Sequence, residues 1–148
     1  MENKLGLNES TIQKIEEELV EFKSKLVDYR FTFGMTDFNF KYLLRLHEFL
    51  FGDLYYDAGK ISKRYQEEDI DVFDRKIKTI VELIKTKDPD IENIAILINE
   101  LIDDQLFDDG NSRTIHLFFN NVINCYHYEG DDYAVALKNA IKKSGRIF

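Results

Sequence analysis

Apolar residues recur three and four positions apart along most of this chain, and that spacing constrains the fold more than any other feature. A run of this kind places its apolar side chains on one face of a helix. The chain has one proline and seven glycines, so few residues interrupt the runs. The apolar stripes lie at residues 12–29, 40–51, 70–84, 94–102, 115–126 and 133–141. We therefore expect an all-α fold of about six helices, with at most a short β-hairpin near Gly59.

The length and composition are typical of one globular domain covering residues 1–148. Hydrophobic residues make up 44% of the chain, enough for a core, and neither a linker nor an internal repeat divides it. The net charge of −8 comes from acidic residues spread along the chain, which disfavours a nucleic-acid surface because phosphate contacts need clustered lysine and arginine. No stretch approaches the ~18 apolar residues of a membrane span, and the N-terminus lacks the apolar run of a signal peptide. We expect a cytoplasmic protein that binds neither nucleic acid nor a membrane.

Several side chains on these stripes are expected in the core. The first stripe consists of Ile12, Ile15, Leu19, Phe22, Leu26 and Tyr29. Ser10 and Gln13 predict a capping box at its start. The stripe is expected to pack on the rest of the chain, with a coiled coil between two copies as the alternative. Cys125, the only cysteine, and His47 also lie on apolar stripes and are expected to be buried.

Residues 103–119 read DDQLFDDGNSRTIHLFF and join the fourth stripe to the fifth. Gly110 permits a positive φ angle, so that successive backbone N–H groups can point into one concavity, and the helix that follows favours an anion at its N-terminus. Arg113 would add a forked guanidinium in the first helical turn, and His116 lies on the same face. Asp109 precedes the glycine, where Mg²⁺ would lie beside a phosphate. The segment predicts a phosphate site, and an ordinary turn is the alternative.

This segment resembles the signature HPFxxGNGRxxR of the Fic (Fido-fold) family, whose usual activity is transfer of AMP from ATP to a protein hydroxyl. Residues 105–116 align with the signature without a gap. Residues 4–23 (KLGLNESTIQKIEEELVEFK) are similar to the family's opening helix, residues 43–62 (LLRLHEFLFGDLYYDAGKIS) to its LxxIHxxLFxDxYxWAGKxR segment, and residues 133–143 (YAVALKNAIKK) to its final helix. The resemblance covers most of the chain. It implies a Fic-like helical domain with the motif helix, residues 109–125, near its centre.

The resemblance also implies a role for each matching residue. Phe107 would be the aromatic residue of the motif that packs in the core, and Asp109 would hold Mg²⁺. Five residues would bind the nucleotide. The anion hole would be shaped by Gly110, Asn111 and Ser112. The two arginine positions of the signature, which contact the ATP phosphates, are occupied by Arg113 and His116. ATP and Mg²⁺ are the implied cofactors, and a protein target or regulator is the implied partner.

Four departures from the family bear on activity. Gln105 occupies the place of the family's histidine base, and an amide cannot accept the proton of a target hydroxyl, a loss that typically costs about 10²–10⁴-fold in rate. His116 replaces the second arginine, which impairs contacts to the terminal phosphate, since a histidine is mostly neutral at about pH 7 unless an anion raises its pKa. Ser112 adds a Cβ atom where the family has glycine. Residues 63–71 (KRYQEEDID) are short and acidic where the family has the hairpin that clamps its target.

These residues favour a degenerate Fic-domain protein that has lost most or all of its transfer activity and acts through protein contacts. The alternative is a Fic-type nucleotidyl or phosphoryl transferase that remains active with altered chemistry, because phosphoryl transfer depends mainly on positioning and electrostatics. A second alternative is a helical protein-interaction domain that binds no nucleotide.

Overall fold

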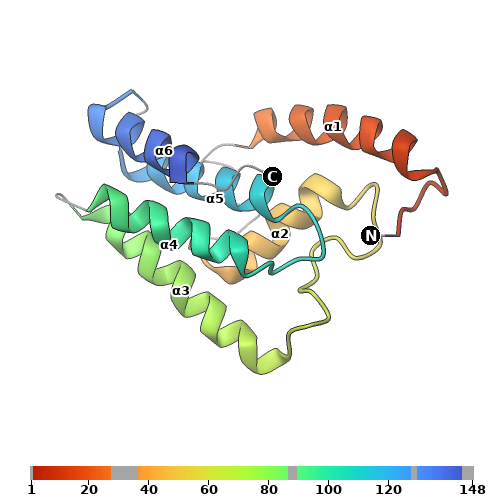
Figure 1. Cartoon of the computed structure of the whole chain (residues 1–148), viewed down its shortest axis with the longest axis horizontal. Coiled ribbons are helices and arrows are strands. Elements are labelled where there is room, and N and C mark those ends of the chain that lie inside the picture. The colour runs from red at the N-terminus through yellow and green to blue at the C-terminus, as the bar shows by residue number, and fades with distance from the viewer. Residues whose placement is uncertain (1, 28–36, 87–89, 128–129, 145–148) are drawn as a thin grey trace.

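The computed structural model describes residues 2–27, 37–86, 90–127 and 130–144, which form six α-helices and no sheet (Figure 1). The helices are α1 (Glu9–Leu26), α2 (Phe40–Phe51), α3 (Glu67–Lys85), α4 (Ile91–Asp103), α5 (Asn111–Tyr126) and α6 (Asp132–Ser144). Turns and irregular segments fill residues 52–66, and an isolated antiparallel bridge between Asn3 and Tyr55 is the sole strand-like pairing within those ranges. The all-α prediction is confirmed. None of the helices described is long and apolar enough to cross a membrane.

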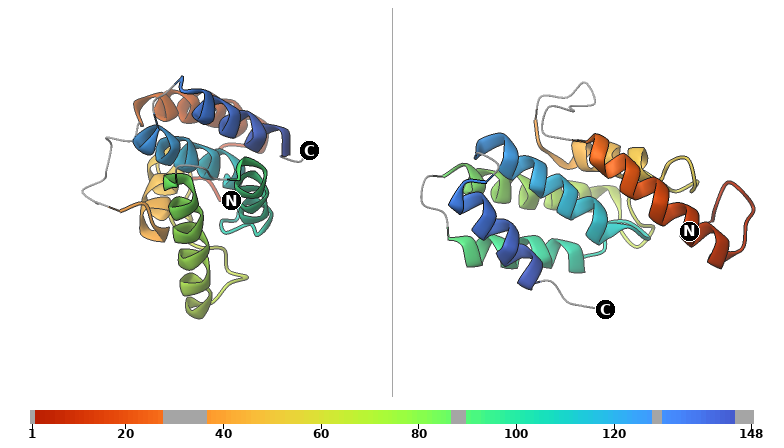
Figure 2. Two further views of the ribbon diagram at one scale, coloured as in Figure 1. Left: turned by 90° about the vertical axis from the view of Figure 1, so that its left-hand side faces the viewer. Right: turned by 90° about the horizontal axis from the view of Figure 1, so that it is seen from above.

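Helix α5 runs through the middle of the bundle, as the two views in Figure 2 show. It contacts α2, α3, α4 and α6, and α6 also packs along α4. The apolar residues that α5 buries in the core are Ile115, Phe118, Phe119, Val122 and Ile123. Burial of one such large side chain contributes roughly 1.5–3 kcal/mol relative to exposure. Because α5 is packed on several sides, its N-terminal end, where the predicted phosphate site begins, is held in a fixed position.

The start of α1 differs from the prediction. The side chain of Asn8 caps this helix, with Oδ1 accepting a hydrogen bond from Thr11 N at 2.9 Å. The predicted capping box of Ser10 and Gln13 is wrong, because Asn8 satisfies the free N–H group of Thr11 and leaves Ser10 inside the first turn.

Three residues expected in the core lie at the surface instead. Phe22 and Leu26 of α1 are 61% and 55% exposed. The reason is that α1 packs mainly along α2, so that only a narrow face of it is covered. Cys125 is also exposed, because the last turn of α5 lies at the surface. Tyr29, the last residue of the predicted stripe, is outside the described residues.

Candidate functional site

Residues 105–110, which we term the motif loop, connect α4 to α5. Gly110 is the N-cap residue of α5, with a φ angle of 76°, and no side chain caps this helix. The N–H groups of residues 111–113 are consequently left for an external acceptor, because the first turn of a helix offers them none. A Cβ atom on Gly110 would lie 2.5 Å from Cε2 of Phe51. Glycine is therefore required at this position both by the backbone angle and by the packed ring.

The side chain of Asn111 holds the motif loop in a tight curve. Its Oδ1 accepts a hydrogen bond from Phe107 N at 2.8 Å, and its Nδ2 donates to Phe107 O at 2.8 Å. The ring of Phe107 is buried. At the other end of the loop, Thr114 Oγ1 donates to Gly110 O at 2.7 Å. Phe107 thus anchors the loop in the core, while Asn111 shapes it through backbone contacts.

His47 of α2 supports the motif loop from within the core. Its Nδ1 accepts a hydrogen bond from Gly59 N at 2.9 Å, and its Nε2 lies 2.9 Å from Asp109 O. Because Nδ1 already accepts an N–H, the neutral ring carries its hydrogen on Nε2 and donates it to the Asp109 carbonyl. Burial lowers the pKa of His47, which keeps this neutral form. The expected burial of His47 is confirmed. No local sequence pattern indicated that His47 would join the segment containing Gly59 to the motif loop.

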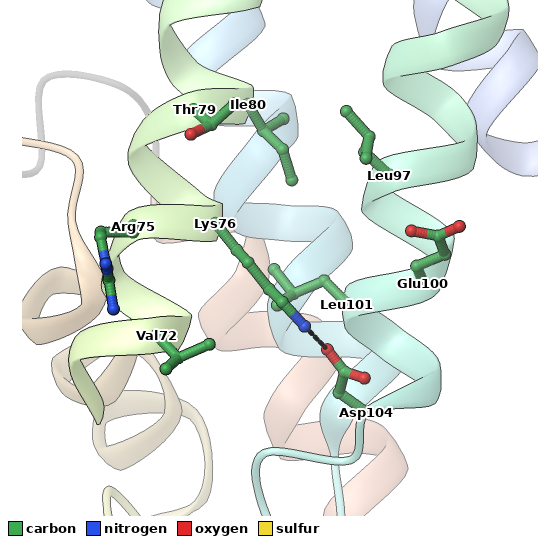
Figure 3. A pocket seen from close by; sticks show the side chains of 9 residues that line it. All are labelled: Val72, Arg75, Lys76, Thr79, Ile80, Leu97, Glu100, Leu101 and Asp104. Atoms are coloured by element: carbon green, nitrogen blue, oxygen red, sulfur yellow. Dashed lines mark hydrogen bonds and ion pairs between the residues drawn. The ribbon is translucent and has the colours of Figure 1, made fainter. Parts of the chain in front are cut away.

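Further contacts fix the chain on either side of position 105. Ser62 N donates to Leu106 O at 2.7 Å, and the hydroxyl of Tyr65 donates to Asp104 O. Lys76 reaches across from α3, and its Nζ lies 3.1 Å from Oδ2 of Asp104 (Figure 3). The end of α4 and the start of the motif loop are therefore held by three side chains or N–H groups from two other segments, residues 52–66 and α3.

The ion pair of Lys76 and Asp104 crosses a cavity of about 380 Å³ between α3 and α4 (Figure 3). The side chains of Ile80, Leu97 and Leu101 form apolar walls between the two helices. None of the residues predicted to bind nucleotide or metal lines this cavity. We do not assign the functional site here, because Lys76 and Asp104 neutralise each other, and the two other charged residues that line the cavity, Arg75 and Glu100, are also of opposite sign.

A second cavity, of about 560 Å³, gathers most of the predicted site residues, and we term it the loop cavity. It is lined by Ile102, Asp103, Gln105, Asp108, Asp109, Gly110, Asn111, Ser112 and Arg113. Gln105 is exposed and has a φ angle of 52°, a left-handed conformation that residues other than glycine seldom adopt. The structure therefore brings the amide at the base position, the glycine and the first arginine to one cavity.

His116 does not line the loop cavity. It lines an adjoining one of about 450 Å³, which we term the helix cavity, with Ser24, Ser112, Arg113, Leu117 and Asn120. Ser112 and Arg113 line both cavities. Nδ1 of His116 lies 3.4 Å from Ser112 Oγ, and its Nε2 is buried without a hydrogen-bond partner. Burial lowers the pKa of His116, so the imidazole is neutral near neutral pH.

The carboxylates of the loop cavity do not form a preassembled metal centre. Within the part of the chain that the structure describes, no group of three or more His, Cys, Asp or Glu side chains could hold a metal ion. Asp109 Oδ1 accepts a hydrogen bond from Gly110 N at 2.8 Å, which leaves its second oxygen for another ligand. Mg²⁺ commonly binds through one or two carboxylates, several waters and substrate phosphates. Asp109 therefore fits Mg²⁺ in combination with a bound phosphate.

Glu16 of α1 adds a negative charge near the site, and sequence patterns did not identify it. It is half-buried, and its Oε1 has no hydrogen-bond partner. Burial raises the pKa of Glu16, whereas a hydrogen bond from Tyr55 and the charge of Arg113 act in the opposite direction. The charge of Asp109 raises it further. Because α1 is far from the motif loop in sequence, only the tertiary structure could reveal this proximity.

The Fic/DOC family matches this chain over residues 37–123. One similar solved structure is the N-terminal Fic domain of a Bep effector protein, a substrate of the VirB T4SS, from Bartonella sp. AR 15-3. Its TM-score is 0.66 and its sequence identity is 15%, and the match covers 96% of this chain and 85% of that one. BepC, a VirB-translocated effector from Bartonella tribocorum with bound AMPPNP, has a TM-score of 0.66 and 14% identity over 97% of this chain and 90% of its own. No curated protein sequence matches. At these identities the structural likeness shows a common fold.

Proposed function

This chain belongs to the Fic/DOC family, and on that premise we propose that it is a nucleotide-binding Fic domain in which transfer of AMP to a protein hydroxyl is lost or strongly reduced. Members of this family are generally protein adenylyltransferases. The observation that carries the proposal is that Gln105, an amide in place of the family's base, shares one cavity with Arg113 and the uncapped start of α5. Gln105 lines the same cavity as Gly110 and Arg113, so a nucleotide bound there would meet the amide.

The start of α5 supports the nucleotide-binding part of the proposal. The uncapped N–H groups of residues 111–113 and the helix dipole together favour a negatively charged group at this end. Arg113 is exposed in the first turn and offers a planar guanidinium that matches phosphate oxygens. Asp109 supplies one carboxylate for Mg²⁺ held jointly with the phosphates. The bound AMPPNP in the BepC structure is consistent with a nucleotide at this fold.

The chemistry of Gln105 supports the loss of transfer. Its amide oxygen can accept a hydrogen bond from a target hydroxyl, but it cannot hold the proton near neutral pH. Loss of a general base typically slows a reaction by about 10²–10⁴-fold. The site would then position ATP without efficient transfer, and we propose that the domain acts mainly through contacts with a protein target or regulator.

Two measurements on the unmodified chain test this proposal. Isothermal titration calorimetry with ATP and Mg²⁺ is expected to detect binding. Incubation with labelled ATP and a cell lysate is expected to leave both the lysate proteins and the chain itself unlabelled. Efficient labelling would instead support an active transferase with altered chemistry. Failure to bind any adenine nucleotide would support a helical interaction domain.

A further inference from the structure

Helix α1 carries an apolar stripe that the rest of the domain covers only in part, and we infer that this stripe pairs with the same stripe of a second copy of the chain, in an antiparallel arrangement. Phe22 and Leu26 are the two most exposed large hydrophobic side chains in the described part of the chain. They are four residues apart and therefore lie on one face of α1. Helix α1 lies at the edge of the bundle and packs mainly along α2 (Figure 1).

The spacing of the stripe is that of a helix that pairs with another helix. Its apolar residues alternate at steps of three and four, and they are Ile12, Ile15, Leu19, Phe22 and Leu26. This alternation is the a and d pattern of a coiled-coil seam. Such a seam drifts by about 20° per heptad around a straight helix. It therefore turns out of the core along α1, from Ile12, which is buried, through two half-buried residues to Phe22 and Leu26, which are exposed.

Charged residues along one edge of the stripe favour pairing with a second copy. Glu18 and Lys25 are exposed, and each immediately precedes an a residue, so both lie on the same edge. In an antiparallel pair with Leu19 opposite Phe22 of the second copy, a two-fold axis places this edge of both helices on the same side. Glu18 then comes within two residues, roughly 3 Å along the helix axis, of Lys25 of the second copy, and the reverse pair forms as well. The stripe is therefore complementary in charge to itself.

The contacts of Lys23 argue against a parallel pair. In that arrangement Lys23, on the other edge of the stripe, would have to meet Glu18 of the second copy. Its Nζ instead donates hydrogen bonds within its own chain, to a backbone carbonyl of α2 at 2.8 Å and to Oδ2 of Asp53. Lys25 forms an exposed ion pair with Glu21, with 3.7 Å between Nζ and Oε1, and a pair of this kind contributes little to stability. Lys25 can therefore turn to a second copy, whereas Lys23 is already bound.

Sedimentation equilibrium of the full chain, at concentrations from about 1 μM to about 1 mM, tests the pairing across the range of a weak interface. We expect an equilibrium between monomer and dimer. Phe22→Ser is expected to raise the dissociation constant of the dimer at least about tenfold, because it removes a central apolar side chain from each copy. Ile96→Ser is the matched control, because Ile96 is also exposed but lies on α4. Circular dichroism checks that both variants keep the fold.

Charge reversals on α1 test the orientation of the pair. Lys25→Glu places two carboxylates opposite each other at two points of the interface, so we expect it to raise the dissociation constant about threefold or more. Glu18→Lys combined with Lys25→Glu restores opposite charges without changing the net charge, and it should return the dissociation constant to that of the unmodified chain. Lys142→Glu is the matched control, because it makes the same change of charge at an exposed position of α6.

A chain that stays monomeric at the highest concentration would overturn the inference. An equal change in Phe22→Ser and Ile96→Ser would place the dimer interface outside the stripe and would also overturn it. If Lys25→Glu weakens the dimer no more than Lys142→Glu does, or if the double variant is not rescued, the antiparallel arrangement is wrong.

Discussion

The imidazole of His47 lies flat against the ring of Phe107, with the ring centroids 3.9 Å apart and the planes 8° from parallel. The same imidazole bonds Gly59 N and Asp109 O, so one buried side chain joins α2, the segment after it and the motif loop. The motif loop, which begins the proposed phosphate site, is thus anchored in the core.

We expect His47→Phe to lower the free energy of unfolding by about 2–4 kcal/mol, because it leaves the Gly59 N–H group and the Asp109 carbonyl unpaired. It is also expected to weaken nucleotide binding by loosening the motif loop. Urea unfolding and calorimetric titration measure the two effects. His127→Phe is the control, because His127 is within hydrogen-bond distance of one carbonyl, that of Ile84, at the far end of α5. Equal losses of nucleotide affinity in both variants would contradict the bracing role of His47.

The lowered pKa of His47 predicts a dependence of stability on pH. In the unfolded chain His47 takes up a proton near its usual pKa of 6.5, whereas in the folded protein burial moves this pKa down. The unfolded state therefore binds more protons between these two values, and stability rises with pH there. The contribution is complete above the unfolded pKa and is lost as pH falls through the folded pKa. Urea unfolding at about pH 7.5 and about pH 5.5 should show a shallower pH dependence in His47→Phe than in the unmodified chain.

We expect Gly110→Ala to destabilise the protein by roughly 2–4 kcal/mol, through the left-handed backbone and the contact of the new Cβ with Phe51. Gly6→Ala is the matched control. Gly6 has a φ angle of 64°, and a Cβ atom added there would meet no other atom within 4 Å, so this variant should lose only about 1 kcal/mol. Thermal and urea unfolding compare the two variants. Similar losses would mean that the packing against Phe51 adds nothing.

Arg113→Ala is expected to weaken ATP binding by at least about tenfold, since hydrogen bonds to charged groups are each worth roughly 1.5–3 kcal/mol. The fold should be unaffected, because Arg113 is exposed and directed to the cavities. Calorimetric titration and circular dichroism measure binding and fold. Arg75→Ala removes an exposed arginine of α3 and should leave binding unchanged. If Arg113→Ala binds ATP with the affinity of the unmodified chain, the motif loop is an ordinary turn without a role in phosphate binding.

We expect Gln105→His to raise AMP transfer, detected as an added AMP on the chain by intact-mass spectrometry after incubation with ATP and Mg²⁺. A histidine can accept the hydroxyl proton, and it tolerates the left-handed backbone at this position better than most residues. The gain should fall short of the full ~10²–10⁴-fold effect of a base, because the contacts to the terminal phosphate stay incomplete.

The triple variant Gln105→His, Ser112→Gly, His116→Arg separates two causes of a weak gain. If the triple variant transfers AMP and Gln105→His does not, the residues at positions 112 and 116 limit the reaction as well as the missing base. Gln105→Asn is the control, because it changes the side chain without adding a proton acceptor. If the triple variant neither binds nor transfers, the nucleotide site is absent.

The six helices, their order and the motif loop could be predicted from the amino-acid sequence. These features are local: apolar spacing defines the buried face of each helix, and Gly110 with the residues that follow it defines a loop and an uncapped helix start. Residues 105–113 could be selected as one candidate site for the same reason, since they are contiguous in the chain.

The segment that packs against each helix face could not be predicted from local sequence, because it depends on the tertiary fold. Phe22 and Leu26 are left exposed because α1 is covered mainly by α2, although both belong to a regular apolar stripe. In the folded chain His47 bonds to the motif loop, and Glu16 is near enough to Asp109 and Arg113 for their charges to interact. His116 lines the helix cavity and not the loop cavity. The spacing of residues along a chain fixes which of them share a face, but burial, hydrogen-bond partners and charge neighbours depend on segments that are distant in sequence.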